Sequence, residues 1–265
     1  MHPPPCLPRL RLTPLVALLA CPVLASAALP VQLSCTPDRV HRVALTLDDQ
    51  GAPLGASVSI AAGTRECDLA TQGNATAIAT GGWRFAWQDD VLGAAYTAQV
   101  ERSGSGYTLR VQPAACGVLT MPASFSLAAA AKGCTTTVDR QAAFVQFWRE
   151  FRTAVTRNDG ETLVRLSLPQ LEFIEDPDTV KAPASVMRHA ARCVPDVPAP
   201  VQRTDLRTML KTLTDPRLDM PPLSLRKNST VSLAGAMTAA WTPDGWRIQG
   251  FNASPSVMRD CRDGR

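Results

Sequence analysis

Cysteines are the residues of this sequence whose type and spacing most clearly indicate chemistry. The chain has 265 residues and eight cysteines. Two of them, Cys6 and Cys21, fall in an N-terminal segment that resembles a secretory signal. The other six are therefore expected in an oxidising compartment, where an even number of cysteines is typical of disulfides. Four precede residue 135 and two follow it, which favours bonds within each group. We predict the pairs Cys35–Cys67, Cys116–Cys134 and Cys193–Cys261.

Metal binding and nucleophilic catalysis are the other chemistries that cysteine supports. The sequence has no CxxC pair, and only His41 and His189 lie outside the signal segment, so the ligand spacing of a zinc site is missing. No Ser, Thr or Cys stands in a nucleophile motif such as G-x-S-x-G. We therefore predict no catalytic residue from sequence motifs, no metal site and no cofactor.

The signal itself occupies residues 1–27. Arg9 and Arg11 precede an apolar run over residues 15–24, and Ala25-Ser26-Ala27 has the small residues of a cleavage site. Cleavage near Ala27 predicts a periplasmic or secreted protein. In the alternative, residues 18–21 act as a lipobox and Cys21 becomes a lipidated N-terminus. No later segment reaches 18 apolar residues, so no transmembrane segment is predicted.

Composition and charge indicate a globular protein without a nucleic-acid partner. Hydrophobic residues make up 45% of the chain and charged residues 19%. The formal net charge is +4, of which Arg9 and Arg11 of the signal contribute two. No long run of one sign occurs, so the basic patch of a nucleic-acid-binding protein is missing.

The elements that must position these residues divide into two domains, 28–135 and 139–265. The first is predicted to be all-β, because short segments rich in β-branched and aromatic residues alternate with turn signals. Seven short strands in this length favour a disulfide-bonded sandwich or barrel. Gly and Ser at 103–106 predict a hairpin turn. The predicted strands are 31–33, 42–47, 56–60, 83–87, 96–100, 107–112 and 123–127.

Three aromatic residues in this domain share one face. Trp83, Phe85 and Trp87 are spaced by two, and side chains two residues apart lie on the same side of a strand. We expect that face to point into the core. If it points outward, the aromatics form a docking surface for a protein or a glycan. Residues 128–137 are predicted to be the linker to the second domain.

An amphipathic helix opens the second domain and has the clearest periodicity in the chain. Its apolar residues recur at steps of three and four. Asp139 is the predicted N-cap, and Asn158 with Glu161 has the spacing of a capping box that starts a shorter helix, which Pro169 ends. The apolar positions are Phe144, Phe147, Trp148, Phe151, Ala154 and Val155.

The rest of the second domain changes from helical to strand periodicity. Helices are predicted at 185–193 and 205–213. Helices followed by an antiparallel meander give an α+β arrangement. The predicted strands are 171–174, 223–225, 230–233, 236–242 and 246–251.

This half of the chain resembles a known superfamily. The segment FVQFWREFRTAVTRNDGETLVRLSLPQLEF, the helix near Ser185 and the closing GWRIQGF look like small exported bacterial proteins of the NTF2-like (SnoaL-like) superfamily. The resemblance covers residues 140–252, and none is recognised for residues 28–135. It implies a cone-shaped α+β fold, with a curved sheet wrapped around an apolar pocket.

The resemblance also implies candidate site residues. A small apolar ligand is the expected occupant of such a pocket. Enzymes on this scaffold need an acid–base pair in the pocket, and His189 is the only histidine of the domain, with Glu172 and Asp176 as the nearest carboxylates in sequence. In the alternative interpretation, His189 is a solvated or capping residue. The candidate pocket-lining residues are Phe147, Trp148, Phe151, Phe173 and Trp246.

Function is predicted from the compartment and from the missing catalytic motifs. We expect an exported two-domain protein that binds an unknown protein or a small apolar ligand without converting it. One alternative is an inhibitor or immunity-type protein directed against a cell-wall hydrolase. Another is a small-molecule hydrolase or isomerase that uses the pocket of the NTF2-like domain.

Overall fold

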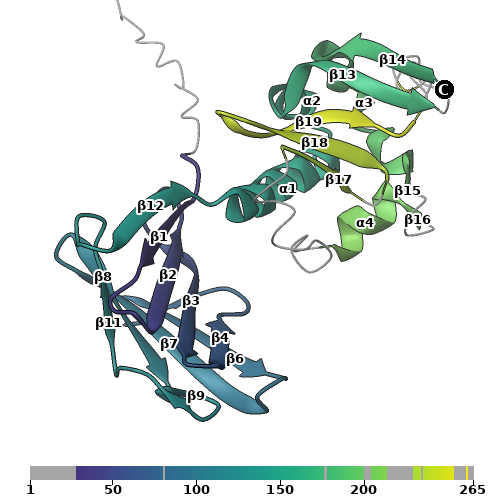
Figure 1. Ribbon diagram of the computed structural model, residues 1–265. Helices are drawn as coiled ribbons and strands as arrows, with labels where there is room; N and C mark the ends of the chain where they lie inside the picture. The colour runs from purple at the N-terminus through teal and green to yellow at the C-terminus, as the bar shows by residue number, and fades with distance from the viewer. Residues whose placement is uncertain are drawn as a thin grey trace, which may run out of the picture.

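The fold is mostly β, with several sheets (Figure 1). Three disulfides join cysteines of the described residues. The computed structural model describes residues 28–79, 81–175, 178–199, 204–213, 229–233, 235–253 and 261. The predicted signal at 1–27 and the alternative lipid anchor at Cys21 lie outside these residues.

Two antiparallel five-stranded sheets form the first half of the chain. The first sheet has the order β12-β1-β2-β3-β4 and the second has the order β11-β8-β7-β6-β5. The first consists of β1 (Val31–Cys35), β2 (His41–Leu47), β3 (Pro53–Ala62), β4 (Arg65–Ala70) and β12 (Cys134–Val138). The second consists of β5 (Thr76–Ala77), β6 (Trp83–Asp89), β7 (Ala94–Ser103), β8 (Gly106–Gln112) and β11 (Phe125–Leu127). A short ribbon, β9 (Ala115–Cys116) with β10 (Leu119–Thr120), follows β8.

One hydrophobic core lies between these two sheets, which makes them a sandwich. Alternate residues of each strand point inward, as the pleat of a strand requires. Leu45 from the first sheet and Phe85 and Val100 from the second are fully buried in the same cluster. Phe85 and Trp87 are buried, which confirms the core interpretation for these two residues, whereas Trp83 is only partly buried and packs against the border of the core.

The strands follow one another around the sandwich in chain order. β1 to β4 run through the first sheet, β5 to β8 run through the second, and β11 lies beside β8. β12 then pairs with β1, with Val31 opposite Val138. The predicted linker at 128–137 is therefore wrong in its second part. Its threonines suit an edge strand, because β-branched residues fit a pleated surface.

The pairing of the strands explains which cysteines form disulfides. Cys35 and Cys134 are directly opposite each other in the pair β1/β12. Cys67 on β4 bonds Cys116 on β9 and so joins the first sheet to the ribbon. The predicted pairs Cys35–Cys67 and Cys116–Cys134 are therefore wrong, because closeness in sequence does not reveal that β12 returns to β1. The third bond, Cys193–Cys261, agrees with the prediction.

Two helices begin the second half. α1 (Arg140–Thr156) starts at Asp139, whose carboxylate accepts hydrogen bonds from the backbone N–H groups of Gln141 and Ala142, so the predicted N-cap is confirmed. α2 (Gly160–Arg165) is capped by Asp159 and not by Asn158. Asn158 has a φ of 55°, a conformation that Asn adopts more readily than most residues, and it makes the turn between the helices.

A mixed five-stranded sheet packs against α1. Its order is β14-β13-β19-β18-β17, and β13 runs parallel to β19 while the other pairs are antiparallel. A parallel pair needs a long connection between its strands, and most of the second half supplies it. The strands are β13 (Ser167–Glu175), β14 (Asp178–Pro183), β17 (Thr230–Leu233), β18 (Met237–Thr242) and β19 (Gly245–Phe251).

Short elements make up the connection between β14 and β17. The predicted helix at 185–193 is shorter in the structure, because a 3-10 turn at Ala184–Val186 precedes it and Cys193 begins another turn. The predicted strand at 223–225 lies outside the described residues. The elements are α3 (Met187–Ala190), a 3-10 turn at Val194–Asp196, β15 (Pro198–Ala199), β16 (Thr204–Asp205) and α4 (Leu206–Thr212).

Candidate functional site

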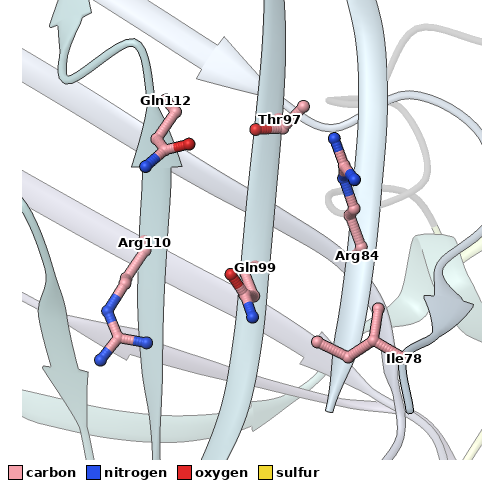
Figure 2. Close-up of a pocket in the computed structure, with 6 residues that line it drawn as sticks. All are labelled: Ile78, Arg84, Thr97, Gln99, Arg110 and Gln112. Carbon is pink, nitrogen blue, oxygen red and sulfur yellow. The ribbon is translucent and has the colours of Figure 1, made fainter. Parts of the chain in front are cut away.

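A polar groove on the outer face of the second sandwich sheet is the candidate site. It encloses about 330 Å³, which is at the small end of ligand-binding pockets. Figure 2 shows its side chains on three neighbouring strands, with an isoleucine at one border. The lining residues are Ile78, Arg84, Thr97, Gln99, Arg110 and Gln112.

Strand alternation places these side chains together. On β7, Tyr96, Ala98 and Val100 are buried, so the residues between them must face outward. The strand register then aligns these residues with their neighbours. Arg84, Gln99 and Arg110 form one row across β6, β7 and β8. Thr97 and Gln112 belong to the next row, where Ala86 is the partner of Thr97 on β6.

The two arginines of the groove differ in their partners. Arg110 Nη1 lies 2.8 Å from Glu101 Oε2, and Gln99 Nε2 donates to Glu101 Oε1 at 3.1 Å. Glu101 therefore compensates the charge of Arg110 and orients Gln99. Arg84 is exposed and has no hydrogen bond or ion pair to any described residue. The groove thus displays one uncompensated cation beside neutral amide and hydroxyl groups.

The side chains of this groove can bind a ligand through charge and hydrogen bonds. An arginine does not act as a base, because its guanidinium stays protonated in proteins. The amides and the hydroxyl can donate and accept hydrogen bonds, yet none of the lining residues is a histidine, a carboxylate or a cysteine. Recognition of a polar ligand is the chemistry that remains.

Sequence reasoning missed this groove. It used the inward aromatics of β6 to predict a core and did not follow the alternate positions, where Arg84 stands between two of those aromatics. The polar residues of β7 and β8 alternate in the same way, so their common face was visible in the sequence. Their alignment into rows depends on the strand register, which the turn at 103–106 sets for β7 and β8 and the turn at 90–93 sets for β6 and β7.

The aromatic residues predicted to line a pocket in the second half are all buried. Trp148 Nε1 donates to the carbonyl of Leu213 at 2.7 Å, and Trp246 Nε1 donates to that of Arg140 at 2.8 Å. Phe173 stacks with Phe251 at a centroid distance of 6.0 Å. Phe147 and Trp246 border a cavity of about 50 Å³, whose lining does not include Trp148, Phe151 or Phe173.

The predicted acid–base candidate, His189, is exposed on α3. It has no hydrogen bond to Glu172, whose carboxylate lies 3.6 Å from Lys181 Nζ instead. Asp176 lies outside the described residues. Among the described residues, the structure therefore does not bring His189 together with a carboxylate.

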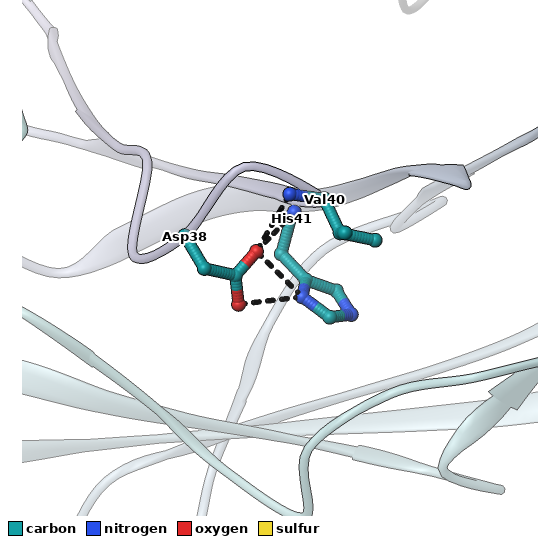
Figure 3. Close-up of polar contacts among 3 residues, drawn as sticks. All are labelled: Asp38, Val40 and His41. Atoms are coloured by element: carbon teal, nitrogen blue, oxygen red, sulfur yellow. Dashed lines mark hydrogen bonds and ion pairs between the residues drawn. The ribbon is translucent and has the colours of Figure 1, made fainter. Parts of the chain in front are cut away.

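A histidine–carboxylate contact does occur in the first half (Figure 3), and sequence reasoning did not identify it. His41 Nδ1 lies 2.8 Å from Asp38 Oδ2. Asp38 Oδ1 also accepts from the backbone N–H groups of Val40 and His41. The hydrogen bond from the His41 side chain, helped by these two, lowers the pKa of Asp38.

The other ring nitrogen of His41 has no hydrogen-bond partner among the described residues. This nitrogen, Nε2, is buried, and the ring lies 5.8 Å from that of Phe125 across the sandwich. A catalytic histidine needs a proton acceptor or donor in reach, and no such group contacts Nε2. We interpret the His41–Asp38 pair as a contact that stabilises the turn leading into β2.

A third hollow lies between the β2–β3 turn and α1 and encloses about 220 Å³. Asp48 and Asp49 border it on one side, and Gln146 and Arg149 border it on the other. Asp48 Oδ1 accepts hydrogen bonds from the backbone N–H groups of Gln50 and Ala52. Asp48 therefore stabilises the β2–β3 turn.

Metal, membrane and family comparisons add no further site. No group of His, Cys, Asp and Glu in the described part of the chain could hold a metal ion. In the same part, no helix is long and apolar enough to cross a membrane. Comparison of the chain with protein-family models, with curated proteins and with solved structures gave no match.

Proposed function

We propose that this chain is an exported, non-catalytic binding protein whose sandwich binds a polar ligand. The groove over β6, β7 and β8 is the observation that carries the proposal. It combines Arg84, which has no ion-pair partner among the described residues, with Thr97 and Gln112, whose side chains make no hydrogen bond to these residues, on regular strands. Binding groups held on regular strands are positioned more firmly than groups on loops.

Three disulfides support the exported part of the proposal, since such bonds persist in oxidising compartments. The predicted signal at 1–27 supports it as well. A mixed sheet preceded by two helices supports the NTF2-like assignment of residues 140–252, which we retain as a proposal. Its aromatic residues fill the interior, so we assign the binding role to the sandwich.

A ligand titration followed by ¹H–¹⁵N NMR tests the proposed function. The probes are galactose, galacturonate, N-acetylglucosamine, triglutamate and inorganic phosphate. We expect at least one probe to shift the resonances of Thr97, Gln99 and Gln112. Thr97→Trp should abolish these shifts because the indole fills the groove. Ser59→Trp is the matched control, since Ser59 pairs with Arg42 on the outer face of the other sheet.

Three results would contradict the proposal. In the first, no probe shifts the groove resonances. In the second, Thr97→Trp binds the probes as well as the wild-type protein does. In the third, a probe is chemically converted during the titration, which would support the hydrolase or isomerase alternative.

A further inference from the structure

The charge of the groove limits the charge of its ligand. Its lining contains two arginines and no carboxylate, and Glu101 pairs with Arg110. One positive charge, that of Arg84, remains for a ligand. A single exposed guanidinium matches a monoanion. A phosphate dianion would leave one negative charge without a partner in the groove.

The shape of the guanidinium favours a carboxylate as that monoanion. Arginine presents its N–H groups in a planar fork that fits the two oxygens of a carboxylate. Arg84 has no partner among the described residues that would occupy this fork. The other arginine of the groove, Arg110, is already hydrogen-bonded to Glu101, which also accepts from Gln99.

The neighbours of Arg84 define the rest of the ligand. Gln99 lies beside Arg84 on the next strand, at the usual strand spacing of about 4.8 Å. Thr97 is one outward position further along β7, at a backbone distance of about 6.8 Å from Gln99. Thr97 and Gln112 have no side-chain hydrogen-bond partners among the described residues. Amides and hydroxyls both donate and accept, so they suit a ligand rich in hydroxyl groups.

The backbone of the groove argues against an extended peptide as the ligand. Peptides that bind sheets add to an exposed edge, where backbone N–H and C=O groups are free. The strand β7 at the centre of the groove pairs with β6 on one side and β8 on the other. Its backbone groups are therefore used within the sheet. Only side chains remain for recognition.

We propose that the groove binds a hydroxylated monocarboxylate of the sugar-acid class, with its carboxylate on Arg84 and its hydroxyl groups on Thr97, Gln99 and Gln112. This inference rests on the proposed function and specifies its ligand. The isoleucine at the border, Ile78, contacts the apolar edge of the sugar ring.

Galacturonate and galactose form a matched pair of probes, because they differ only in the carboxylate at C6. We expect galacturonate to bind about tenfold more tightly than galactose in NMR titrations at low salt. A charge-assisted bidentate contact supports a difference of that size. The difference should shrink at high salt, because salt screens exposed charges.

The variant Arg84→Gln should remove the preference for galacturonate and leave the weak binding of galactose in place. Arg42→Gln is the matched control, because Arg42 is exposed on β2 in the opposite sheet. This control should keep the full preference. A dispersed NMR spectrum establishes that each variant is folded.

The outcomes separate this inference from the proposed function. If galactose and galacturonate bind equally, or if Arg84→Gln keeps the preference, the sugar-acid assignment is wrong while the groove remains a binding site. Tighter binding of triglutamate or inorganic phosphate than of galacturonate also overturns the assignment. If no probe binds the groove at all, the proposed function itself fails.

Discussion

The two halves of the chain both bury aromatic side chains, but they differ in the hollows that they present. In the second half, aromatic side chains from α1, β13 and β19 meet in one core, and both Trp148 and Trp246 have their indole N–H groups paired with backbone carbonyls. In the sandwich, aromatic side chains are buried as well, but the outer face of one sheet displays polar side chains that include Arg84, which has no ion-pair partner among the described residues.

This difference indicates where a ligand can bind. A helix rich in aromatics is the stronger sequence signal, yet its side chains are fully used in packing. The weaker signal, polar residues at alternate positions of three strands, produces the larger hollow. The cavity bordered by Phe147 and Trp246 encloses about 50 Å³ and the hollow between the β2–β3 turn and α1 about 220 Å³, whereas the groove encloses about 330 Å³.

Replacement of a core aromatic should have the largest effect and tests whether α1 serves packing. We expect Trp148→Ala to lower the free energy of unfolding by about 3–5 kcal/mol, because it removes a fully buried indole and leaves a cavity. Urea denaturation measures this loss. Arg84→Gln, on the exposed face, should change it by less than about 0.5 kcal/mol. A small effect of Trp148→Ala would mean that the aromatics line an open pocket after all.

Removal of a sandwich disulfide should have the next largest effect. We expect Cys35→Ala with Cys134→Ala to cost about 2–4 kcal/mol, because the bond closes a long loop of the unfolded chain. The sequence separation is 99 for this bond and 49 for Cys67–Cys116, so the second double variant should cost slightly less. Peptide mapping without reduction checks the pairing, and a fragment joining Cys35 to Cys67 would refute it.

Loss of the α1 cap, which also contacts β2, should lower the free energy of unfolding by less than loss of a disulfide. Asp139 Oδ1 accepts from two backbone N–H groups of the helix, and its Oδ2 accepts from Thr46 Oγ1 at 2.9 Å. We expect Asp139→Ala to lower the free energy of unfolding by about 1–2 kcal/mol. Thr46→Val removes only the bond to β2 and should cost less than Asp139→Ala. Equal losses in the two variants would show that the cap itself contributes nothing.

Acid should lower the free energy of unfolding of the second half more than that of the sandwich, because two described carboxylates with a lowered pKa lie in the second half and one lies in the sandwich. Hydrogen bonds from Thr162 and Thr208 lower the pKa of Asp159 and of Asp205 below the ordinary 3.8, and His41 does the same for Asp38. Each ionised carboxylate stabilises the fold above the unfolded pKa, and this contribution is lost as the pH falls through the lower folded pKa.

Circular dichroism with urea between about pH 5 and pH 2 measures this acid sensitivity. Asp159→Asn combined with Asp205→Asn should reduce the acid-induced decrease in the free energy of unfolding more than Asp38→Asn does. Asparagine is a suitable replacement because it also caps helices. Equal reductions in both proteins would contradict the expected difference between the halves.

The sequence was most informative where a local pattern determines the structure. The spacing of Phe144, Phe147 and Trp148 predicted α1, and Asp139 predicted its start. The hairpin at 103–106 also follows from local turn chemistry. In each case, the decisive contacts lie within a few residues of one another.

Long-range pairing explains what the sequence could not predict. Nothing near Cys134 indicates that it faces Cys35, because that contact depends on β12 returning to β1. The groove likewise requires Arg84, Gln99 and Arg110 in register on three strands. The pocket that the NTF2-like resemblance implied could not be evaluated from residue types, since an aromatic side chain can line a cavity or fill it.

The return of β12 to β1 also determines where this chain can be divided. Without residues 134–138, β1 becomes the edge of its sheet and exposes unpaired backbone groups to other chains. β12 covers that edge with a short strand whose residues from Thr135 to Val138 are exposed. A sandwich fragment ending before β12 should therefore aggregate by strand addition, whereas one ending after Val138 should stay monomeric.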